Sequence, residues 1–134
     1  MRLTAPSSRM TLDQRREQTR RRRIAAGPLA AAFPVVELVR IQLNFVDSSS
    51  HPPSGQVHVI YPPAPAFFEY ACPYGDCDGG LDLNDAVASM VAKSTPQAEG
   101  TVGCTGFRAG AGPVKRPCEL LANFRIAAEY QPKT

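Results

Sequence analysis

The four cysteines of this 134-residue chain are the residues with the clearest potential for chemistry. Cys72 and Cys77 enclose a Pro-Tyr-Gly-Asp turn, and Cys104 and Cys118 stand at the two ends of a downstream Gly/Pro-rich stretch. Thiolates are good ligands for Zn²⁺, which structural sites hold tetrahedrally with each sulfur about 2.3 Å from the ion. Each pair lies where a predicted strand meets a loop. We therefore predict that Cys72, Cys77, Cys104 and Cys118 converge on one structural zinc ion.

The first cysteine pair resembles the cysteine hairpin of the zinc-ribbon family, and the resemblance extends over residues 67–120. It implies a structural metal held by Cys72, Cys77, Cys104 and Cys118, and a small sheet that contacts nucleic acid or protein. The chain departs from the family in its spacing. Zinc ribbons usually separate paired cysteines by two residues, whereas the gaps here are four and thirteen. A predicted helix between the pairs is also atypical.

Other interpretations of the cysteines stay open at this stage. Disulfides Cys72–Cys77 and Cys104–Cys118 would suit an exported protein. The thiols could also be unrelated, could hold an iron–sulfur cluster, or could form a redox-active site that releases zinc on oxidation. If zinc is bound, four thiolates need backbone N–H groups or a cation nearby, and residues 74–79, Arg108 and Lys115 are the candidates.

Positive charge is concentrated at the start of the chain. Residues 1–34 carry eight arginines against two acidic residues, and the remainder carries seven basic against ten acidic residues, which together give the net charge of +3. We interpret residues 1–34 as a basic arm and residues 35–134 as a zinc-ribbon-like domain. Thr11 and Gln14 form a capping-box pattern before a predicted helix from Leu12 to about Ala26.

Six arginines of this predicted helix are its candidate functional residues. The helix has few apolar members, so we expect it to project from the domain or to be partly ordered. Its crowded charges would be relieved by RNA or DNA phosphates, or by an acidic protein surface. The proposed contacts are Arg15, Arg16, Arg20, Arg21, Arg22 and Arg23. A solvated arm without a partner is the alternative.

Hydrophobic periodicity predicts an α+β fold with five or six antiparallel strands and one packed helix. Val39, Ile41 and Leu43 alternate with polar residues, as expected for a strand with one buried face. We predict strands over residues 35–47, 56–61, 66–72, 81–83, 101–104 and 118–130, with loops over 95–100 and 106–117. Asn84 is predicted to cap the packed helix, which ends near residue 94.

The remaining chemistry-bearing residues have simpler interpretations. His58 is expected on the solvent face of its strand and His51 in a loop, and neither has a motif partner. Asp76, Asp78, Asp82 and Asp85 superficially resemble a calcium loop, but the required terminal glutamate is missing, so we interpret them as turn and cap residues. Four thiolates would also leave a zinc ion no position for water. We therefore predict a protein that is not an enzyme.

Location and partner follow from these points as expectations. A short apolar run at residues 24–33 weakly suggests a signal peptide but is interrupted by Gly27 and Pro28. Reduced thiols favour a cytoplasmic location, and no membrane attachment is expected. We predict a zinc-binding protein that contacts nucleic acid or a ribonucleoprotein through its arginine helix. The alternative is a protein-interaction module that uses a face or edge of the sheet, with zinc purely structural.

Overall fold

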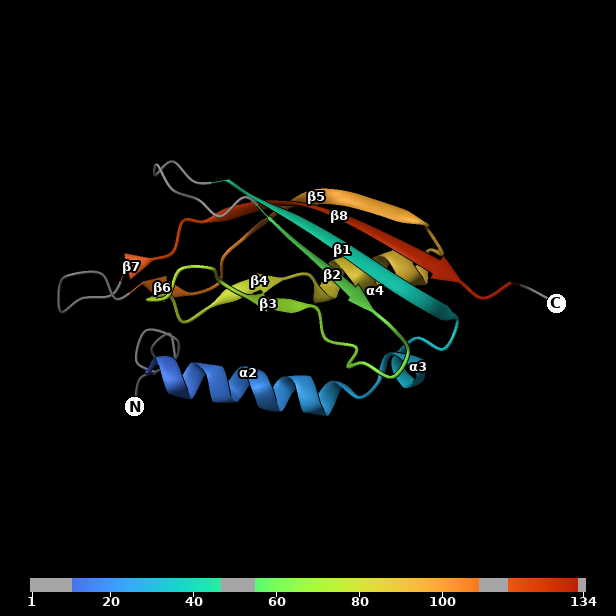
Figure 1. Cartoon of the computed structure of the whole chain (residues 1–134), viewed down its shortest axis with the longest axis horizontal. Helices are drawn as coiled ribbons and strands as arrows, with labels where there is room; N and C mark the ends of the chain where they lie inside the picture. Colours follow the sequence, from blue (N-terminus) through green and yellow to red (C-terminus); the bar gives the residue numbers. More distant parts are fainter. Residues whose placement is uncertain (1–10, 47–54, 109–115, 133–134) are drawn as a thin grey trace, which may run out of the picture.

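An antiparallel four-stranded sheet forms the centre of the fold (Figure 1). A computed structural model describes residues 11–46, 55–108 and 116–132. The elements of these residues are the helices α2 (Leu12–Ala26), α3 (Leu29–Ala32) and α4 (Asn84–Ala92), and the strands β1 (Val36–Val46), β2 (Gln56–Ile60), β3 (Glu69–Ala71), β4 (Gly80–Asp82), β5 (Gln97–Gly103), β6 (Phe107–Arg108), β7 (Arg116–Pro117) and β8 (Leu121–Tyr130). The central sheet has the order β2-β1-β8-β5, and β3–β4 and β6–β7 form two small antiparallel pairs.

The central sheet buries one face. Along β1, Val39, Ile41 and Leu43 are fully buried, whereas the alternate residues Arg40 and Gln42 are exposed, as the period of two requires. The pairing of β1 with β8 places these rows beside the matching rows of β8. The predicted strand at residues 35–47 and its hairpin with the next strand are confirmed.

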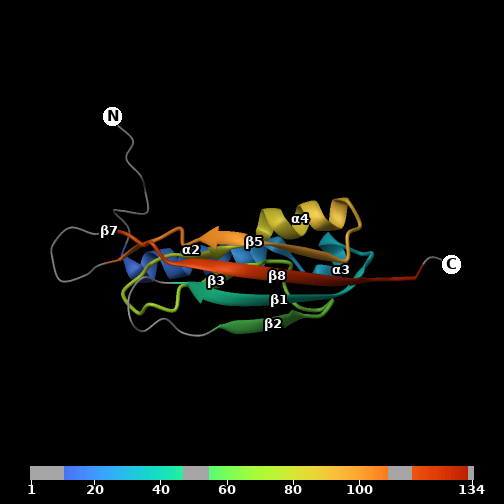
Figure 2. The ribbon, with the colours of Figure 1, turned by 90° about the horizontal axis from the view of Figure 1, so that it is seen from above.

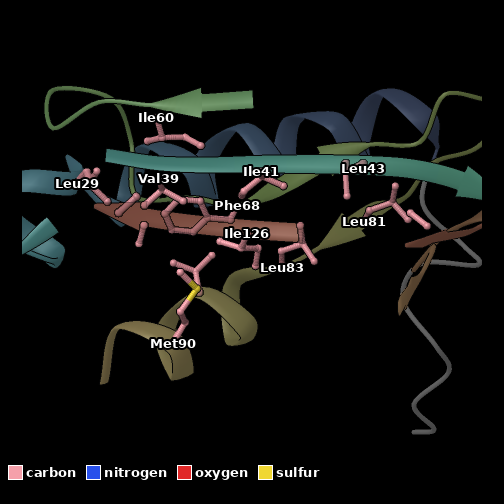
Figure 3. Close-up of a cluster of buried hydrophobic side chains, with 14 of the residues drawn as sticks. Leu29, Val39, Ile41, Leu43, Ile60, Phe68, Leu81, Leu83, Met90 and Ile126 are labelled. Carbon is pink, nitrogen blue, oxygen red and sulfur yellow. The ribbon is translucent and has the colours of Figure 1, made fainter. Parts of the chain in front are cut away.

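The core fills the space between this face and a second layer (Figure 3). Phe68 lies at its centre and is 1% exposed, and α4 contributes Val87 and Met90. Leu29 from α3 is also fully buried. In Figures 1 and 2, all three helices and the β3–β4 pair lie on the same side of the central sheet. The opposite face of the sheet, with Arg40 and Gln42, carries none of these elements.

Several sequence predictions of strands and loops are wrong. The described residues form eight strands rather than five or six, and the predicted loop at 106–117 contains β6 and β7. Residues 95–100 are not all loop, because β5 begins at Gln97 and pairs with β8 along its whole length. This strand contains two glycines and no large apolar residue, so hydrophobic periodicity does not predict it. A Cβ at Gly100 would lie 2.8 Å from the ring of Phe124, so the aromatic ring occupies the space that a side chain would need. The predicted strand at 66–72 is reduced to β3, since Phe67 and Phe68 pack as irregular chain.

The orientation of β2 also differs from the expectation. His58 does not face solvent: its ring stacks on Tyr70 with centroids 3.9 Å apart, and the residue is half-buried. Val57 and Val59 are 52% and 43% exposed instead. The reason is that β2 is an edge strand whose inner face meets the β3 segment, a contact that the alternation pattern does not encode.

The start of α4 is fixed by a different residue from the one predicted. Asn84 is the first helical residue rather than the N-cap. Its amide oxygen accepts a hydrogen bond from the backbone N–H of Phe68 at 2.8 Å. Leu83 is the N-cap and makes no side-chain capping bond; the Asp82 carboxylate, just before the helix, accepts from the backbone N–H of Asn84 at 2.9 Å. This pair of contacts ties α4 to β4 and to the core residue Phe68.

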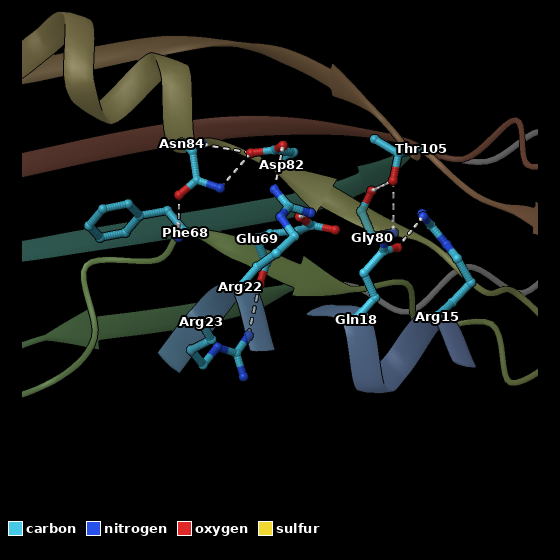
Figure 4. A network of polar contacts seen from close by, with 10 residues as sticks. All are labelled: Arg15, Gln18, Arg22, Arg23, Phe68, Glu69, Gly80, Asp82, Asn84 and Thr105. Atoms are coloured by element: carbon cyan, nitrogen blue, oxygen red, sulfur yellow. Dashed lines mark hydrogen bonds and ion pairs between the residues drawn. The ribbon is translucent and has the colours of Figure 1, made fainter. Parts of the chain in front are cut away.

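Helix α2 forms as the sequence predicts but does not project from the domain. The capping box between Thr11 and Gln14 is present. Arg22 forms an ion pair of 2.9 Å with Glu69, and Arg23 donates to the Glu69 carbonyl at 3.1 Å (Figure 4). Both guanidinium groups also lie over the ring of Phe67, at 5.2 and 5.3 Å from its centroid. The helix is therefore held by charged side chains rather than by an apolar stripe.

The charge on the β3–β4 pair explains this contact. Glu69 and Asp82 are direct cross-strand neighbours, and like charges in such positions repel. Arg22 lies between them, 2.9 Å from Glu69 and 3.9 Å from Asp82. The Glu69 side chain is 5% exposed, so it would otherwise be a buried charge without compensation.

The division into residues 1–34 and 35–134 stays a prediction, although Leu29 is part of the core. No helix in the described ranges is long and apolar enough to cross a membrane.

We expect Arg22→Gln to lower the free energy of unfolding by about 1–3 kcal/mol, because it leaves the buried Glu69 carboxylate without its cation. The measurement is urea denaturation followed by circular dichroism. Arg21→Gln is the matched control, because Arg21 is 77% exposed and pairs with Glu17 of its own helix; it should change stability by less than about 0.5 kcal/mol. Equal effects of the two variants would contradict this account of Arg22.

Candidate metal centre

The four cysteines come from three places in the chain and meet at one point. Cys72 and Cys77 belong to the turn between β3 and β4, Cys104 directly follows β5, and Cys118 lies between β7 and β8. Their four sulfur atoms all lie within 4.8 Å of one another. Cys77 and Cys118 are buried, and Cys72 and Cys104 are half-buried. The structure thus brings together all four residues that the sequence predicts as ligands, and four thiols at this spacing could hold a metal ion.

Two close sulfur–sulfur pairs connect Cys72 and Cys77 to Cys104 and Cys118. Cys77 and Cys104 are 3.5 Å apart, and Cys72 and Cys118 are 3.9 Å apart. These distances are far longer than a disulfide bond of about 2.05 Å, and all four cysteines are free. Neither of these two pairs is the Cys72–Cys77 or the Cys104–Cys118 pair of the disulfide interpretation. The geometry therefore favours a shared ligand over two local disulfides.

Two backbone N–H groups point at the sulfurs. Gly79 N donates to Cys77 Sγ at 3.4 Å, and Gly106 N donates to Cys104 Sγ at 3.4 Å. Such bonds stabilise negative charge on a thiolate. Gly79 lies in the segment 74–79 that was predicted to supply such N–H groups, whereas the N–H of Gly106 was not predicted. The signal was present as a repeated Cys-x-Gly pattern, Cys77-Asp-Gly79 and Cys104-Thr-Gly106.

The two halves of the site share a backbone arrangement. The N–H of Cys72 donates to the carbonyl of Gly79 at 3.1 Å, and the N–H of Cys118 donates to the carbonyl of Gly106 at 2.9 Å. Gly79 therefore contacts both Cys72 and Cys77, and Gly106 contacts both Cys104 and Cys118. Each glycine donates its N–H to one sulfur and accepts at its carbonyl from the backbone N–H of the other cysteine. This fixes the distance between the paired thiols even though the sequence gaps are four and thirteen residues.

The two glycines also touch each other. A Cβ placed on Gly79 would lie 2.2 Å from Gly106 N, and a Cβ on Gly106 would lie 2.2 Å from Gly79 N. The contacting atoms are backbone, so no side-chain rotation could relieve the overlap. Glycine is required at both positions because the two cysteine-bearing turns cross at van der Waals distance.

Asp78 and Thr105 form hydrogen bonds between the two crossing turns. Asp78 Oδ1 accepts from Phe107 N at 2.6 Å, and Asp78 N donates to the Phe107 carbonyl at 3.1 Å. Thr105 N donates to the carbonyl of Gly80 at 2.9 Å. Asp78, which could have suggested calcium, thus joins two segments 29 residues apart in the sequence. Asp78 therefore has a structural role, as predicted, but its hydrogen bonds connect two different turns rather than residues of one turn.

The thiols influence one another strongly. Hydrogen bonds with Cys104 and then Cys72 lower the pKa of Cys77, whereas hydrogen bonds with Cys72 and then Cys77 raise the pKa of Cys104. These hydrogen bonds therefore favour the thiolate form of Cys77 and the protonated form of Cys104. A cation at the centre would favour the thiolate form of all four cysteines.

A cation from the protein lies beside the site. Arg108 forms an ion pair of 3.0 Å with Asp76 and lies over the Tyr74 ring at 4.0 Å from its centroid. Asp76, and more weakly Cys118 and Cys72, raise the pKa of the Arg108 guanidinium. Arg108 thus has the position expected of a charge that balances the thiolates. Lys115, the other predicted cation, lies outside the described residues.

The arginines of α2 are divided by their contacts. Arg22 and Arg23 contact the body, and Arg20 and Arg21 form ion pairs with Glu17 on the same helix. Arg16, Arg20 and Arg23 line one wall of a cavity of about 220 Å³, and the cysteine turn forms the other wall with Cys72 and Cys77. Arg15 donates to Gln18 at 3.2 Å. The predicted arginine set therefore spreads over two faces of the helix.

His51 lies outside the described residues, and His58 has Gln56 and Tyr70 as neighbours rather than the cysteines. No known protein family, curated protein or solved structure matches this chain.

We expect Gly79→Ala to lower the free energy of unfolding by about 3 kcal/mol and to weaken metal binding, because the new methyl group would separate the crossing turns. The measurements are denaturant titration and metal content. Gly75→Ala is the matched control, since Gly75 lies in the same turn with nothing within 4 Å of its Cβ position. It should change stability by less than about 0.5 kcal/mol. A tolerated Gly79→Ala would show that the turns do not need their close approach.

Proposed function

We propose that the four cysteines hold a structural zinc ion. The observation that carries this is the sulfur geometry. Four sulfurs about 2.3 Å from one ion in a tetrahedron lie about 3.8 Å from one another. Two of the sulfur pairs here are 3.5 and 3.9 Å apart, and all four sulfurs lie within 4.8 Å of one another. The N–H groups of Gly79 and Gly106 add the hydrogen bonds that such thiolates need. A closed shell of four sulfurs gives this ion a structural role rather than a catalytic one.

The same geometry favours a single ion over an iron–sulfur cluster. In a cluster the cysteine sulfurs bind different iron atoms, so they lie farther apart than four sulfurs around one ion. The paired turns also support the likeness to zinc ribbons, with the glycine contacts compensating for the unusual spacing. Thiolates remain available to metal in a reducing compartment, which supports a cytoplasmic location.

We expect protein purified under reducing conditions to contain one zinc ion per chain, measured by elemental analysis and native mass spectrometry. The four thiols should react with a thiol reagent after a chelator is added and not before. Removal of zinc should lower the free energy of unfolding by at least about 3 kcal/mol, because an ion bound by the folded state alone contributes its binding energy to folding.

Cys77→Ser should lose the ion, whereas Gly75→Ala in the same turn should retain it. Substitution with Co²⁺ should give the intense absorption bands of a tetrahedral thiolate complex. Metal-free protein with two disulfides before reduction would overturn the zinc proposal and would support the export interpretation.

The arginine helix supplies the second part of the proposed function, contact with the phosphate backbone of nucleic acid. Because Arg22 and Arg23 contact the body and Arg15 is half-buried, the proposed contacts are mainly Arg16, Arg20 and Arg21. The side chains of Arg20 and Arg21 are 61% and 77% exposed, and Arg16 is also exposed. The packing of α2 against the β3 segment supports this proposal, since it fixes the charges on a rigid helix and lowers the entropy lost on binding.

We expect binding of a 20-base-pair mixed-sequence DNA duplex to weaken steeply with salt, since phosphate contacts release counterions. Replacing Arg16 and Arg20 with glutamine should reduce the slope of log affinity against log salt by about 1.8, which is about 0.9 for each lost phosphate contact. Fluorescence anisotropy at several salt concentrations measures this slope.

The matched control replaces Arg40 and Arg125 with glutamine, which removes the same charge from the open face of the central sheet. This variant should keep the slope of the original protein. A similar loss in both variants would indicate attraction by net charge alone, and an unchanged slope in the first variant would contradict a role for α2.

A further inference from the structure

Strand β2 leaves one edge of the central sheet open. It pairs with β1 and with no other described strand. Among the described residues, its backbone makes no hydrogen bond outside that pairing. Every second residue of an edge strand turns its N–H and C=O away from its neighbour, so these groups remain available. Proteins commonly protect such edges with charged residues or proline, and β2, Gln-Val-His-Val-Ile, contains neither.

A groove of about 450 Å³ runs beside this edge. One wall is β2 itself, and the other includes Pro65, Phe67 and Tyr70, with Arg23 as the charged member. Both walls are mainly apolar or aromatic. The five residues of β2 span about 17 Å at about 3.4 Å each, which is the length of a short extended peptide.

The walls of the groove are held in place before any ligand binds. His58 and Tyr70 stack with their rings 12° from parallel, and His58 Nε2 lies 2.9 Å from Gln56 Oε1. Arg23 is fixed by the Glu69 carbonyl and by the face of Phe67. One of its guanidinium nitrogens makes that hydrogen bond, so donors remain for a ligand. A groove that is already formed loses little entropy when it is filled.

We propose that this groove binds an extended peptide segment of another protein, which adds to the sheet as a strand beside β2 and places an acidic side chain on Arg23. Main-chain hydrogen bonds to the open edge would supply affinity, and alternate side chains would supply selectivity. Side chains on the inner face of the added strand would lie against the aromatic wall. Those on the outer face would lie beside Val57 and Val59, which are about half-exposed.

The chemistry of the groove favours this occupant over two others. A second copy of the chain could pair β2 with β2, but that strand has no acidic residue to place on Arg23. A nucleic acid could stack its bases on the rings, but its backbone has no regular row of N–H and C=O groups to match a strand edge. A peptide with alternating apolar residues and one carboxylate satisfies both features.

The test begins with a displayed library of random octapeptides, selected against the full-length chain purified under reducing conditions. The selected peptides should contain alternating β-branched or aromatic residues with one Asp or Glu at a fixed position. The best peptide is then synthesised with a single N-methyl group at each position in turn. Methylation of every second amide should reduce affinity at least about tenfold, and methylation of the others should have little effect, because a strand turns only alternate amides toward its neighbour.

Charge recognition is tested with the same peptide and its Glu→Gln or Asp→Asn counterpart. The original protein should prefer the acidic form by about tenfold. Arg23→Gln should abolish that preference, and Arg16→Gln, which removes another arginine of the same helix, should preserve it. Because the readout is a preference between two peptides, a general loss of stability would not imitate the result.

Three results would overturn the proposal. The first is a loss of affinity on N-methylation that does not alternate along the peptide. The second is a preference for the acidic peptide over its amide counterpart that persists in Arg23→Gln. The third is displacement of the peptide by a single-stranded RNA octamer of equal affinity. Concentration-dependent dimerisation that Val57→Asp abolishes while the peptide fails to bind would assign the edge to a second copy instead. The proposed DNA contact is independent of these outcomes, since it is measured with Arg16 and Arg20.

Discussion

The contact between Gly79 and Gly106 is the constraint on which the rest of the site depends. Two turns from different parts of the chain cross there at backbone distance. Each glycine holds two cysteines, one by N–H to sulfur and one through a main-chain hydrogen bond. A side chain at either position would separate the turns and move all four thiols. The metal centre is therefore a property of the backbone as much as of its ligands.

Charge balance organises the layer beneath the central sheet. The β3–β4 pair carries Glu69 opposite Asp82, and its turn carries Asp76, so carboxylates are concentrated in a small volume. Arg22 compensates Glu69 and Asp82, and Arg108 pairs with Asp76. An arginine-rich helix with little apolar surface can therefore lie against the domain. Its inner arginines serve the fold, and its outer arginines are those available to a phosphate backbone.

The two proposed binding regions lie on either side of one segment of the chain. Residues from Phe67 to Tyr70 support α2 on one side and the open edge of β2 on the other. Arg23 belongs to both, since it is fixed by Phe67 and Glu69 and also borders the groove. The cysteine turn between β3 and β4 follows this segment directly, so an ion held there would stabilise the segment without contacting the ligand of either region.

The sequence by itself indicated the four cysteines that cluster, α2 with its capping box, and the strands whose alternation is strong, because these depend on residue type and local spacing. It did not determine β5, since Gln97–Gly103 becomes a strand only when β8 supplies a partner and Phe124 fills the space above Gly100. The sequence also predicted that His58 faces solvent and that α2 projects from the domain, whereas His58 stacks on Tyr70 and α2 contacts Glu69. Those outcomes depend on Tyr70 and on the carboxylates of Glu69 and Asp82, which lie near in space but distant in the chain. Tertiary structure alone decided them, because packing and charge compensation act between segments that no local pattern connects.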